Sequence, residues 1–435
     1  MAKVVAIIGL GFGDEGKGGV IDALSAKIPG SVPSLVVKHT GGSQAGHHVV
    51  LADGRHHTFA QFGSGTLQGV TTLLSRHMLI NPIFLEAEAR HLEELGVKDP
   101  YSWLFVEREA LITTPFHVAA NRIREINRTN RHGSCGMGIN ETVALAEHLP
   151  ELALRAGGLM FSRATRAKLE LIREYLLGEL QEAYPVDESN PEWQVLLDEN
   201  SIDEYVELYR DFAYKVNPVD RNFLQGRIRS QGIILFEGAQ GVLLDQNYGF
   251  FPHVTRGNTA AENIDDLVEG HPYTKLGLLR TFLTRHGAGP FPTECPESSL
   301  LFYDGKVLQR DHNHWGPWQE NFRRGYFDLV LAEYAIRMCK GIDVLGLTWT
   351  DAFQQPSFVA TGYRYRNETP FDRLIRAAGE ATPDFLSDCT PVYEVVKSFP
   401  QFQNLLVTRL GTPIQLYSHG PTTDDKLWTP SLLGL

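Results

Sequence analysis

Short apolar runs alternate with longer amphipathic stretches along most of the chain. Residues 4–8 are apolar and glycines follow at once, a pattern typical of a buried parallel strand that leads into a phosphate-binding loop. A helix is expected over residues 20–27. Further strands are expected at residues 35–38, 103–106, 233–236, 344–348 and 414–417, and further helices at residues 83–97, 165–183, 203–215 and 327–340. This alternation predicts an α/β fold with a mostly parallel central sheet and helices on both faces.

The chain is long for one compact domain, with 435 residues. Either one large α/β unit with insertions or two intimate domains would fit this length. No clean linker divides the chain, and no internal repeat is present. We therefore expect a single domain over residues 1–435 with a helical insertion around residues 115–230, in which the polar stretch 185–200 is a surface connection.

Charge and composition limit the partners. The formal net charge of -12 argues against broad nucleic-acid binding and against an anionic membrane as the main partner. The start of the chain does not resemble a signal peptide, and no stretch approaches ~20 apolar residues, so we expect a cytoplasmic protein. The cysteines form no CxxC pair, which suggests neither a zinc site nor a disulfide framework. They are Cys135, Cys295, Cys339 and Cys389.

A glycine-rich loop follows the first predicted strand. Residues 11–18 read GFGDEGKG and fit the pattern GxxxxGK, in which backbone N–H groups approach phosphate oxygens and Lys17 supplies a charge. Gly18 stands where Ser or Thr usually binds magnesium, so a metal ligand must come from elsewhere, and Asp14 is the obvious candidate. The alternative interpretation is a plain glycine-rich turn.

A second loop follows the strand at residues 35–38. Residues 41–48 read GGSQAGHH, and glycines around a histidine at the end of a strand fit an active-site loop. The alternative is a histidine that is merely solvated.

The two loops together resemble the adenylosuccinate synthetase family, whose signature is G-D-E-G-K-G followed by G-G-x-N-A-G-H. Further segments that are similar to family motifs follow in the family's order. They are FEGAQG at 236–241, LLD at 243–245, PHVT at 252–255, TRHGAGPFPTE at 284–294, GYFD at 325–328, TWTD at 348–351 and SHGP at 418–421. Each short motif is weak, but their shared order is specific.

The resemblance implies transfer of the γ-phosphoryl group of GTP to O6 of IMP, followed by displacement of that phosphate by the amine of aspartate. Asp14 would remove the N1 proton and help to hold Mg²⁺, and the Gly46 carbonyl would be a second metal ligand. His47 would donate to the transferring phosphoryl group. Lys17 and the loop amides would stabilise the same charge.

The resemblance also implies the residues that contact the nucleotide. Asp351 would accept from N1 and N2 of guanine, while Trp349 replaces the family's lysine with an indole that can stack on a purine. Alternatively, Trp349 is a core residue and the nucleotide differs. The implied GTP contacts are Gly13, Glu15, Gly16, Lys17, Gly18, Asp351, Ser418 and Gly420.

The implied contacts to the purine monophosphate and the amine form a second set. Ser134 and Cys135 stand where the family has paired threonines for the 5′-phosphate, and a thiol is the weaker donor. The alternative for Gln240 is that it only satisfies backbone groups, and the alternative for Thr255 is that it only caps a turn. The full set is Gln44, Ser134, Cys135, Gln240, Thr255, His286, Arg323 and Arg324.

The sequence departs from the family at the amine-binding loop. The family has T-T-G-R-x-R-R, whereas residues 315–324 read WGPWQENFRR, so that only Arg323 and Arg324 match and Glu320 adds a negative charge. A dicarboxylate demands fixed cations, which puts aspartate in doubt as the amine donor. The family's inter-subunit arginine has no clear counterpart, although Arg155 lies near its position. A homodimer remains the expectation.

These observations leave three functions open. The first is adenylosuccinate synthesis, and the second is a specialised paralogue that uses another amine or a purine-like amide. The third is a non-catalytic GTP-binding regulator. Asp14 and His47 argue against the third, because a switch needs no base beside the phosphoryl group.

Overall fold

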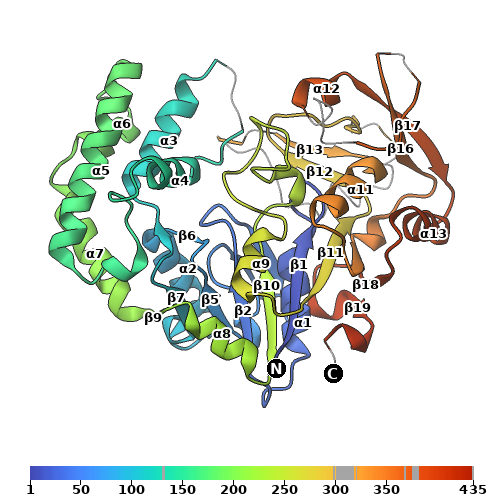
Figure 1. The fold of residues 1–435 in the computed structure, drawn as a ribbon, viewed down its shortest axis with the longest axis horizontal. Coiled ribbons are helices and arrows are strands. Elements are labelled where there is room, and N and C mark those ends of the chain that lie inside the picture. The colour runs from blue at the N-terminus through green and yellow to red at the C-terminus, as the bar shows by residue number, and fades with distance from the viewer. Residues whose placement is uncertain are drawn as a thin grey trace.

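A ten-stranded sheet forms the centre of the molecule in the computed structural model (Figure 1). The structure describes residues 1–129, 133–296, 299, 318–319, 321–366, 369–374 and 382–433. The strand order is β19-β18-β15-β11-β1-β10-β2-β5-β7-β9, and every pairing is parallel except that of β18 with β19. The strands are β1 (Lys3–Gly9), β2 (Ser34–Lys38), β5 (Thr71–Leu74), β7 (Leu104–Glu107), β9 (Asn217–Val219), β10 (Ile233–Glu237), β11 (Thr274–Arg280), β15 (Val344–Thr348), β18 (Ile414–Ser418) and β19 (Lys426–Trp428). The predicted α/β fold with a mostly parallel sheet is confirmed.

Strand β1 shows why its residues are apolar without alternation. Val5 and Ile7 pack with Val20 and Leu24 of α1 (Lys17–Ala26) on one face of the sheet. The neighbouring residues of β1 point to the other face, where they join a cluster that includes residues of α9 (Glu262–Val268) and α11 (Leu329–Met338). Both faces are therefore buried, as in other parallel sheets.

The remaining helices lie around this sheet. Those at or near the predicted positions are α2 (Pro82–Glu94), α5 (Ser162–Ala183) and α7 (Ser201–Lys215). Those not predicted are α3 (Pro115–Asn127), α4 (Ile139–His148), α6 (Pro191–Leu197), α8 (Asn222–Arg229), α12 (Pro383–Ser387) and α13 (Phe399–Leu410). Among the described residues, none of the helices combines the length and apolar character needed to cross a membrane.

The structure differs from two of these predictions. Helix α6 lies within the stretch 185–200 that was expected to be a surface connection. Asn190 caps this helix, Pro191 begins it, and its own Trp193 is buried. The helix expected over residues 327–340 begins only at Leu329, since the first two residues form the short strand β14 (Phe327–Asp328).

Helices α3 to α7 gather on one side of the sheet, on the left in Figure 1. Their apolar residues share a cluster with residues of α2 and β7, among them Leu85, Leu104 and Val106. These helices fall within residues 115–230, and the description of that range as an insertion within one domain stays a prediction.

Four small sheets surround the main one. They are β3 (His47–Val50) with β4 (His56–Phe59), β6 (Leu79–Ile80) with β8 (Leu111–Ile112), β12 (Leu283–His286) with β13 (Phe322–Gly325), and β14 with β16 (Ser357–Tyr365) and β17 (Cys389–Val396). The first and third of these pairs carry predicted site residues beside the carboxyl ends of the central strands.

Candidate active site

A cavity of about 620 Å³ lies at the carboxyl edge of the central sheet. Its walls come from the segments that follow β1, β2, β10, β11, β15 and β18, which is where open α/β sheets bind ligands. The predicted residues that line it are Gly13, Asp14, Gly16, Lys17, Gly18, Gln44, Gly46, His47, Ser134, Cys135, Gln240, Thr255, His286, Ser418 and Gly420. Glu15, Arg323, Arg324 and Asp351 are not among the lining residues.

Glu15 fixes the conformation of the phosphate loop. Its Oε1 accepts from the backbone N–H of Gly11 at 3.0 Å and of Gly13 at 2.8 Å, and its Oε2 pairs with Lys17 Nζ at 2.7 Å. The Glu15 side chain is buried, so it supports the loop and does not face the cavity. Gly13 has φ 103° and Asp14 has φ 62°, so both residues lie in the left-handed region, which is uncommon for a residue with a side chain such as Asp14.

The Asp14 carboxylate is held beside a histidine. Asp14 Oδ2 lies 3.1 Å from Nε2 of His286. Burial acts to raise the pKa of Asp14, but the hydrogen bond and charge of His286, with Arg280 and Lys17, outweigh it and lower the pKa. An ionised carboxylate in the cavity is the state that a general base requires.

His47 is oriented by a buried carboxylate. Its Nδ1 is hydrogen-bonded to Glu237 Oε1, and Glu237 also pairs with Lys38 Nζ at 3.3 Å and accepts from Ser64 Oγ at 2.6 Å. Burial acts to raise the pKa of Glu237, but Lys38, His47 and Ser64 together lower it, so the carboxylate is ionised. Since a carboxylate only accepts, Nδ1 of His47 carries its proton and Nε2 is the ring atom left for a ligand. Burial and Lys38 lower the pKa of His47 itself.

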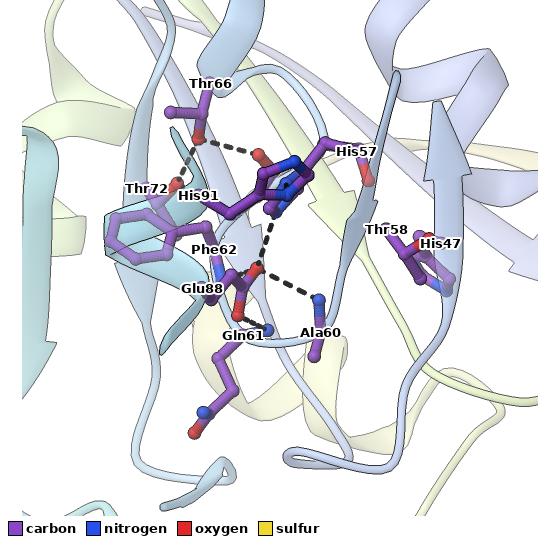
Figure 2. A network of polar contacts seen from close by, with 12 residues as sticks. His47, His57, Thr58, Ala60, Gln61, Phe62, Thr66, Thr72, Glu88 and His91 are labelled. Carbon is purple, nitrogen blue, oxygen red and sulfur yellow. Dashed lines mark hydrogen bonds and ion pairs between the residues drawn. The ribbon is translucent and has the colours of Figure 1, made fainter. Parts of the chain in front are cut away.

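The hairpin that carries His47 is fixed to α2 (Figure 2). Glu88 of α2 accepts from the backbone N–H groups of residues 60–62 at 3.0, 2.9 and 3.1 Å. His57 of β4 is hydrogen-bonded to His91 of α2, with 2.8 Å between their Nδ1 atoms. This anchoring limits how far β3 can move, and with it His47.

The side of the cavity assigned to the purine monophosphate holds unpaired amide groups. Both polar side-chain atoms of Gln44 and Oε1 of Gln240 are buried without a partner among the described residues. Ser134 Oγ donates to Asn121 at 3.0 Å, and burial raises the pKa of Cys135 to about 11, so that its thiol stays neutral. Buried polar groups without partners are costly, so these amides favour a polar ligand.

The side assigned to GTP is bounded by the ends of β15 and β18. Trp349, Ser418 and Gly420 line the cavity there, whereas Asp351 lies in a short 3-10 helix, Thr350–Ala352, behind this wall. Lys426 Nζ donates to the carbonyls of residues 420–422 at 3.1, 2.9 and 2.7 Å and so fixes that loop.

The two arginines expected to bind the amine are arranged differently. Arg323 pairs with Glu294 at 2.6 Å and donates to the carbonyls of Gly287 and Gly289 at 3.1 and 2.8 Å. Arg324 is the next residue of β13, and successive residues of a strand point to opposite faces. The two guanidinium groups therefore do not converge from this strand. Residues 315–317 and Glu320 lie outside the described residues.

Comparison with known proteins gives the same family as the motifs. A family model described as adenylosuccinate synthetase matches residues 6–422. The chain belongs to the adenylosuccinate synthetase family. The adenylosuccinate synthetase of Tolumonas auensis is 30% identical over 457 residues, which cover 98% of both chains. That of Mycobacterium leprae is 30% identical over 399 residues, which cover 90% of this chain and 85% of the relative.

Solved structures support the fold of an adenylosuccinate synthetase. The fully ligated enzyme from Plasmodium falciparum superposes with a TM-score of 0.79 at 21% identity, and the match covers 98% of this chain and 100% of that one. A succinoaminodeoxyadenylate synthetase of cyanophage S-2L, bound to dGMP and to dATP as an energy donor, gives a TM-score of 0.63 at 16% identity and covers 99% and 96%.

Sequence reasoning missed several residues of this adenylosuccinate synthetase site. Glu237 lies in the recognised motif FEGAQG, but its pairing with His47 joins residues 190 positions apart and leaves no local signal. Arg280 ends a strand that was not predicted, and Gln319 follows a tryptophan in the divergent amine loop. The positions of Glu237 and Arg280 at the cavity follow from the order of the strands in the sheet.

Proposed function

We propose that the cavity catalyses GTP-dependent ligation of L-aspartate to IMP, the reaction implied by the family. The observation that carries this proposal is that the ionised carboxylate of Asp14, which belongs to the phosphate loop, and the carboxylate-bound His47 line the same cavity. A base and a phosphoryl-binding group at one loop suit phosphorylation of an amide oxygen.

In the first step, Asp14 accepts the proton from N1 of the purine. The electrons move to O6, which attacks the γ-phosphorus of GTP, and GDP leaves. Phosphorylation converts a poor leaving group into a good one. Lys17 and the backbone N–H groups of the loop stabilise the charge on the phosphate oxygens.

His47 acts on the same oxygens. Its Nδ1–H donates a hydrogen bond to Glu237. Nε2 therefore donates to a phosphoryl oxygen only when the ring carries a second proton. Burial and Lys38 disfavour that imidazolium form, whereas the ionised Glu237 and the approach of an anionic phosphate favour it.

In the second step, the amine nitrogen of aspartate attacks C6. The C6–O6 bond breaks, inorganic phosphate leaves with the oxygen, and the new C–N bond completes the ligation. The Gln44 amide and Oε1 of Gln240, which have no partner within the described part of the chain, would bind the purine nucleotide through both steps.

Mg²⁺ fits this site as a partner of the nucleotide. Asp14 and Gly46 both line the cavity, and one carboxylate with phosphate oxygens is a usual donor set for Mg²⁺. Within the described ranges, no group of three or more His, Cys, Asp or Glu side chains is placed to hold a metal on its own. Bound there, the ion would neutralise charge on the β- and γ-phosphates.

The test is a phosphate-release assay with GTP, Mg²⁺, IMP and L-aspartate, with the product identified by mass spectrometry. We expect release that requires all three substrates and a product with the mass of adenylosuccinate. Release that does not depend on IMP would refute the proposal.

A second candidate keeps the first step and uses another amine donor. The observation in its favour is that Arg323 is already paired with Glu294, which leaves less positive charge for a dicarboxylate. A panel of amino acids at saturating GTP and IMP separates the two, because a neutral amino acid that outperforms aspartate would support the second.

We further propose that the enzyme is a homodimer, as the resemblance implies. Light scattering coupled to size-exclusion chromatography tests this, and a monomer at working concentrations would contradict it.

A further inference from the structure

Arg280 lies beside the phosphate loop but is not among the site residues predicted from the sequence. It is the last residue of β11, which pairs with β1, so its side chain leaves the sheet at the edge where the phosphate loop begins. The residue is 5% exposed and lines the cavity. A buried guanidinium at this point places a permanent positive charge next to Asp14 and Lys17.

The guanidinium packs against two aromatic rings. Its carbon atom lies 4.2 Å from the centroid of Phe282 and 4.3 Å from that of Trp349. Trp349 has φ 58°, and its backbone carbonyl accepts from Thr281 Oγ1 at 2.8 Å. The two rings contact each other edge to face, with centroids 5.6 Å apart. The ring planes are inclined at 82° to each other, so the two rings contact the guanidinium from two directions and fix its position, while its N–H groups can still bind other ligands.

One edge of the Arg280 guanidinium is directed at the phosphate loop. Arg280 Nη1 donates to the Asp14 backbone carbonyl at 3.3 Å and to Thr284 Oγ1 at 3.4 Å. Both acceptors are neutral, and both distances are at the long end for a hydrogen bond. The contact with Asp14 places the guanidinium at the residue proposed to take the purine proton, where the γ-phosphoryl group must also arrive.

Like Arg280, the other lysines and arginines of the cavity wall contact groups within the protein. Lys17 is paired with Glu15 at 2.7 Å, which offsets its charge. Lys426 donates to the carbonyls of residues 420–422. Arg285 donates to the carbonyls of His253, Ala288 and Pro290. A nucleoside triphosphate brings several negative charges, more than Lys17 alone can balance beside Glu15.

We propose that Arg280 binds the phosphates of the nucleotide and stabilises the transferring phosphoryl group, and that Trp349 and Phe282 are positioning residues for its guanidinium. The inference rests on the proposed function, because it assumes a nucleoside triphosphate in this cavity. A fixed arginine within the same chain would add positive charge as charge shifts among the phosphate oxygens. It also gives Trp349 a role that requires no contact with the base.

The test compares Arg280→Ala and Arg280→Lys with the unmodified enzyme. For Arg280→Ala we expect kcat/KM for GTP to fall by roughly 10² or more, the scale of one lost transition-state donor. GTP should bind more weakly, while GMP, which lacks the β- and γ-phosphates, should bind as before. Arg280→Lys should be intermediate, and added guanidinium ion should restore part of the activity of Arg280→Ala.

Arg227→Ala is the matched control. Arg227 also packs against two aromatic rings, with its guanidinium carbon 5.1 Å from the centroid of Phe223 and 5.9 Å from that of Phe105, but it lies on α8 and does not line the cavity. Its loss should leave kcat/KM unchanged. Trp349→Phe should keep most of the activity, whereas Trp349→Ala should lower kcat more than it weakens GMP binding.

Three results would overturn the inference. One is Arg280→Ala with kcat/KM within a factor of two of the unmodified enzyme. Another is an equal loss of affinity for GTP and GMP with a lowered melting temperature, which indicates a structural role. The third applies if Arg280→Ala fails to fold: it is an Arg280→Lys variant that binds the nucleotide as tightly as the unmodified enzyme does. If the unmodified enzyme binds GTP through Arg280 but forms no product from IMP, the proposed function fails and this inference stands.

Discussion

Asp328 links the stability of the fold to pH. Its carboxylate caps α11 by accepting from the backbone N–H of Leu331 at 3.1 Å, and it accepts from Tyr363 Oη at 2.5 Å. The side chain is fully buried. Burial raises its pKa from 3.8 to about 7, in spite of these hydrogen bonds. The folded protein therefore holds a proton on Asp328 more tightly than the unfolded chain does.

The sign of the pH dependence follows from linkage. The contribution of Asp328 to the free energy of unfolding is fully present below its unfolded pKa of 3.8 and is lost as the pH rises through about 7. At about 1.36 kcal/mol per pKa unit, the difference between those two values corresponds to roughly 4 kcal/mol. Asparagine cannot ionise, and it can still cap the helix and bond to Tyr363.

Asp328→Asn should therefore remove this dependence. We expect the variant to become more stable relative to the unmodified protein as the pH is raised from 5 to 8, by roughly 2.5 kcal/mol, because about two pKa units of the difference lie between pH 5 and the folded pKa of about 7. Urea unfolding at a series of pH values measures it, and the difference between the two proteins isolates Asp328 from other titrating groups. A difference in stability that is the same at every pH would refute the reasoning.

Four further outcomes are expected at the active site. Asp14→Asn should lower turnover by ~10²–10⁴, the range for a lost general base, while nucleotide affinity measured by calorimetry changes less. GTP should be preferred to ATP in steady-state kinetics and Asp351→Asn should erode that preference, whereas equal use of both nucleotides by the unmodified enzyme would contradict the guanine assignment. Glu237→Gln should lower kcat more than it changes KM for IMP, because His47 loses the counter-charge of its imidazolium form; an unchanged kcat would remove Glu237 from the mechanism. Gly18→Ala should lower kcat without unfolding the protein, because a Cβ there would lie 2.6 Å from Cβ of His47, and an active variant would show that His47 tolerates displacement.

The sequence predicted the parts of the fold that rest on local patterns. Strand β1 and the loop after it were recognised because an uninterrupted apolar run meets glycines. Strand β11 was missed because Lys275, Gly277 and Arg280 interrupt its apolar residues, and only its position between β1 and β15 explains why it is buried.

Most of the site residues expected from the sequence line one cavity, but their pairings could not be foreseen. Asp14, Lys17 and His47 line one cavity as expected. The partner of His47 could not be foreseen, because Glu237 reaches it from a strand far along the chain. Arg323 and Arg324 are adjacent in sequence and were both expected to bind the amine substrate. Because successive residues of β13 point to opposite faces, their side chains diverge.

The carboxylate of Glu15 beneath the phosphate loop has a consequence for the kinetics of nucleotide binding. A glycine-rich segment without an internal anchor would sample many conformations, and each residue that a ligand had to fix would cost ~1–2 kcal/mol of conformational entropy. Here the amides of Gly11 and Gly13 are already held by Glu15 before any phosphate arrives. The ordering is completed when the chain folds, so the loop is a preorganised template, and encounter with the nucleotide need not wait for the loop to find its shape.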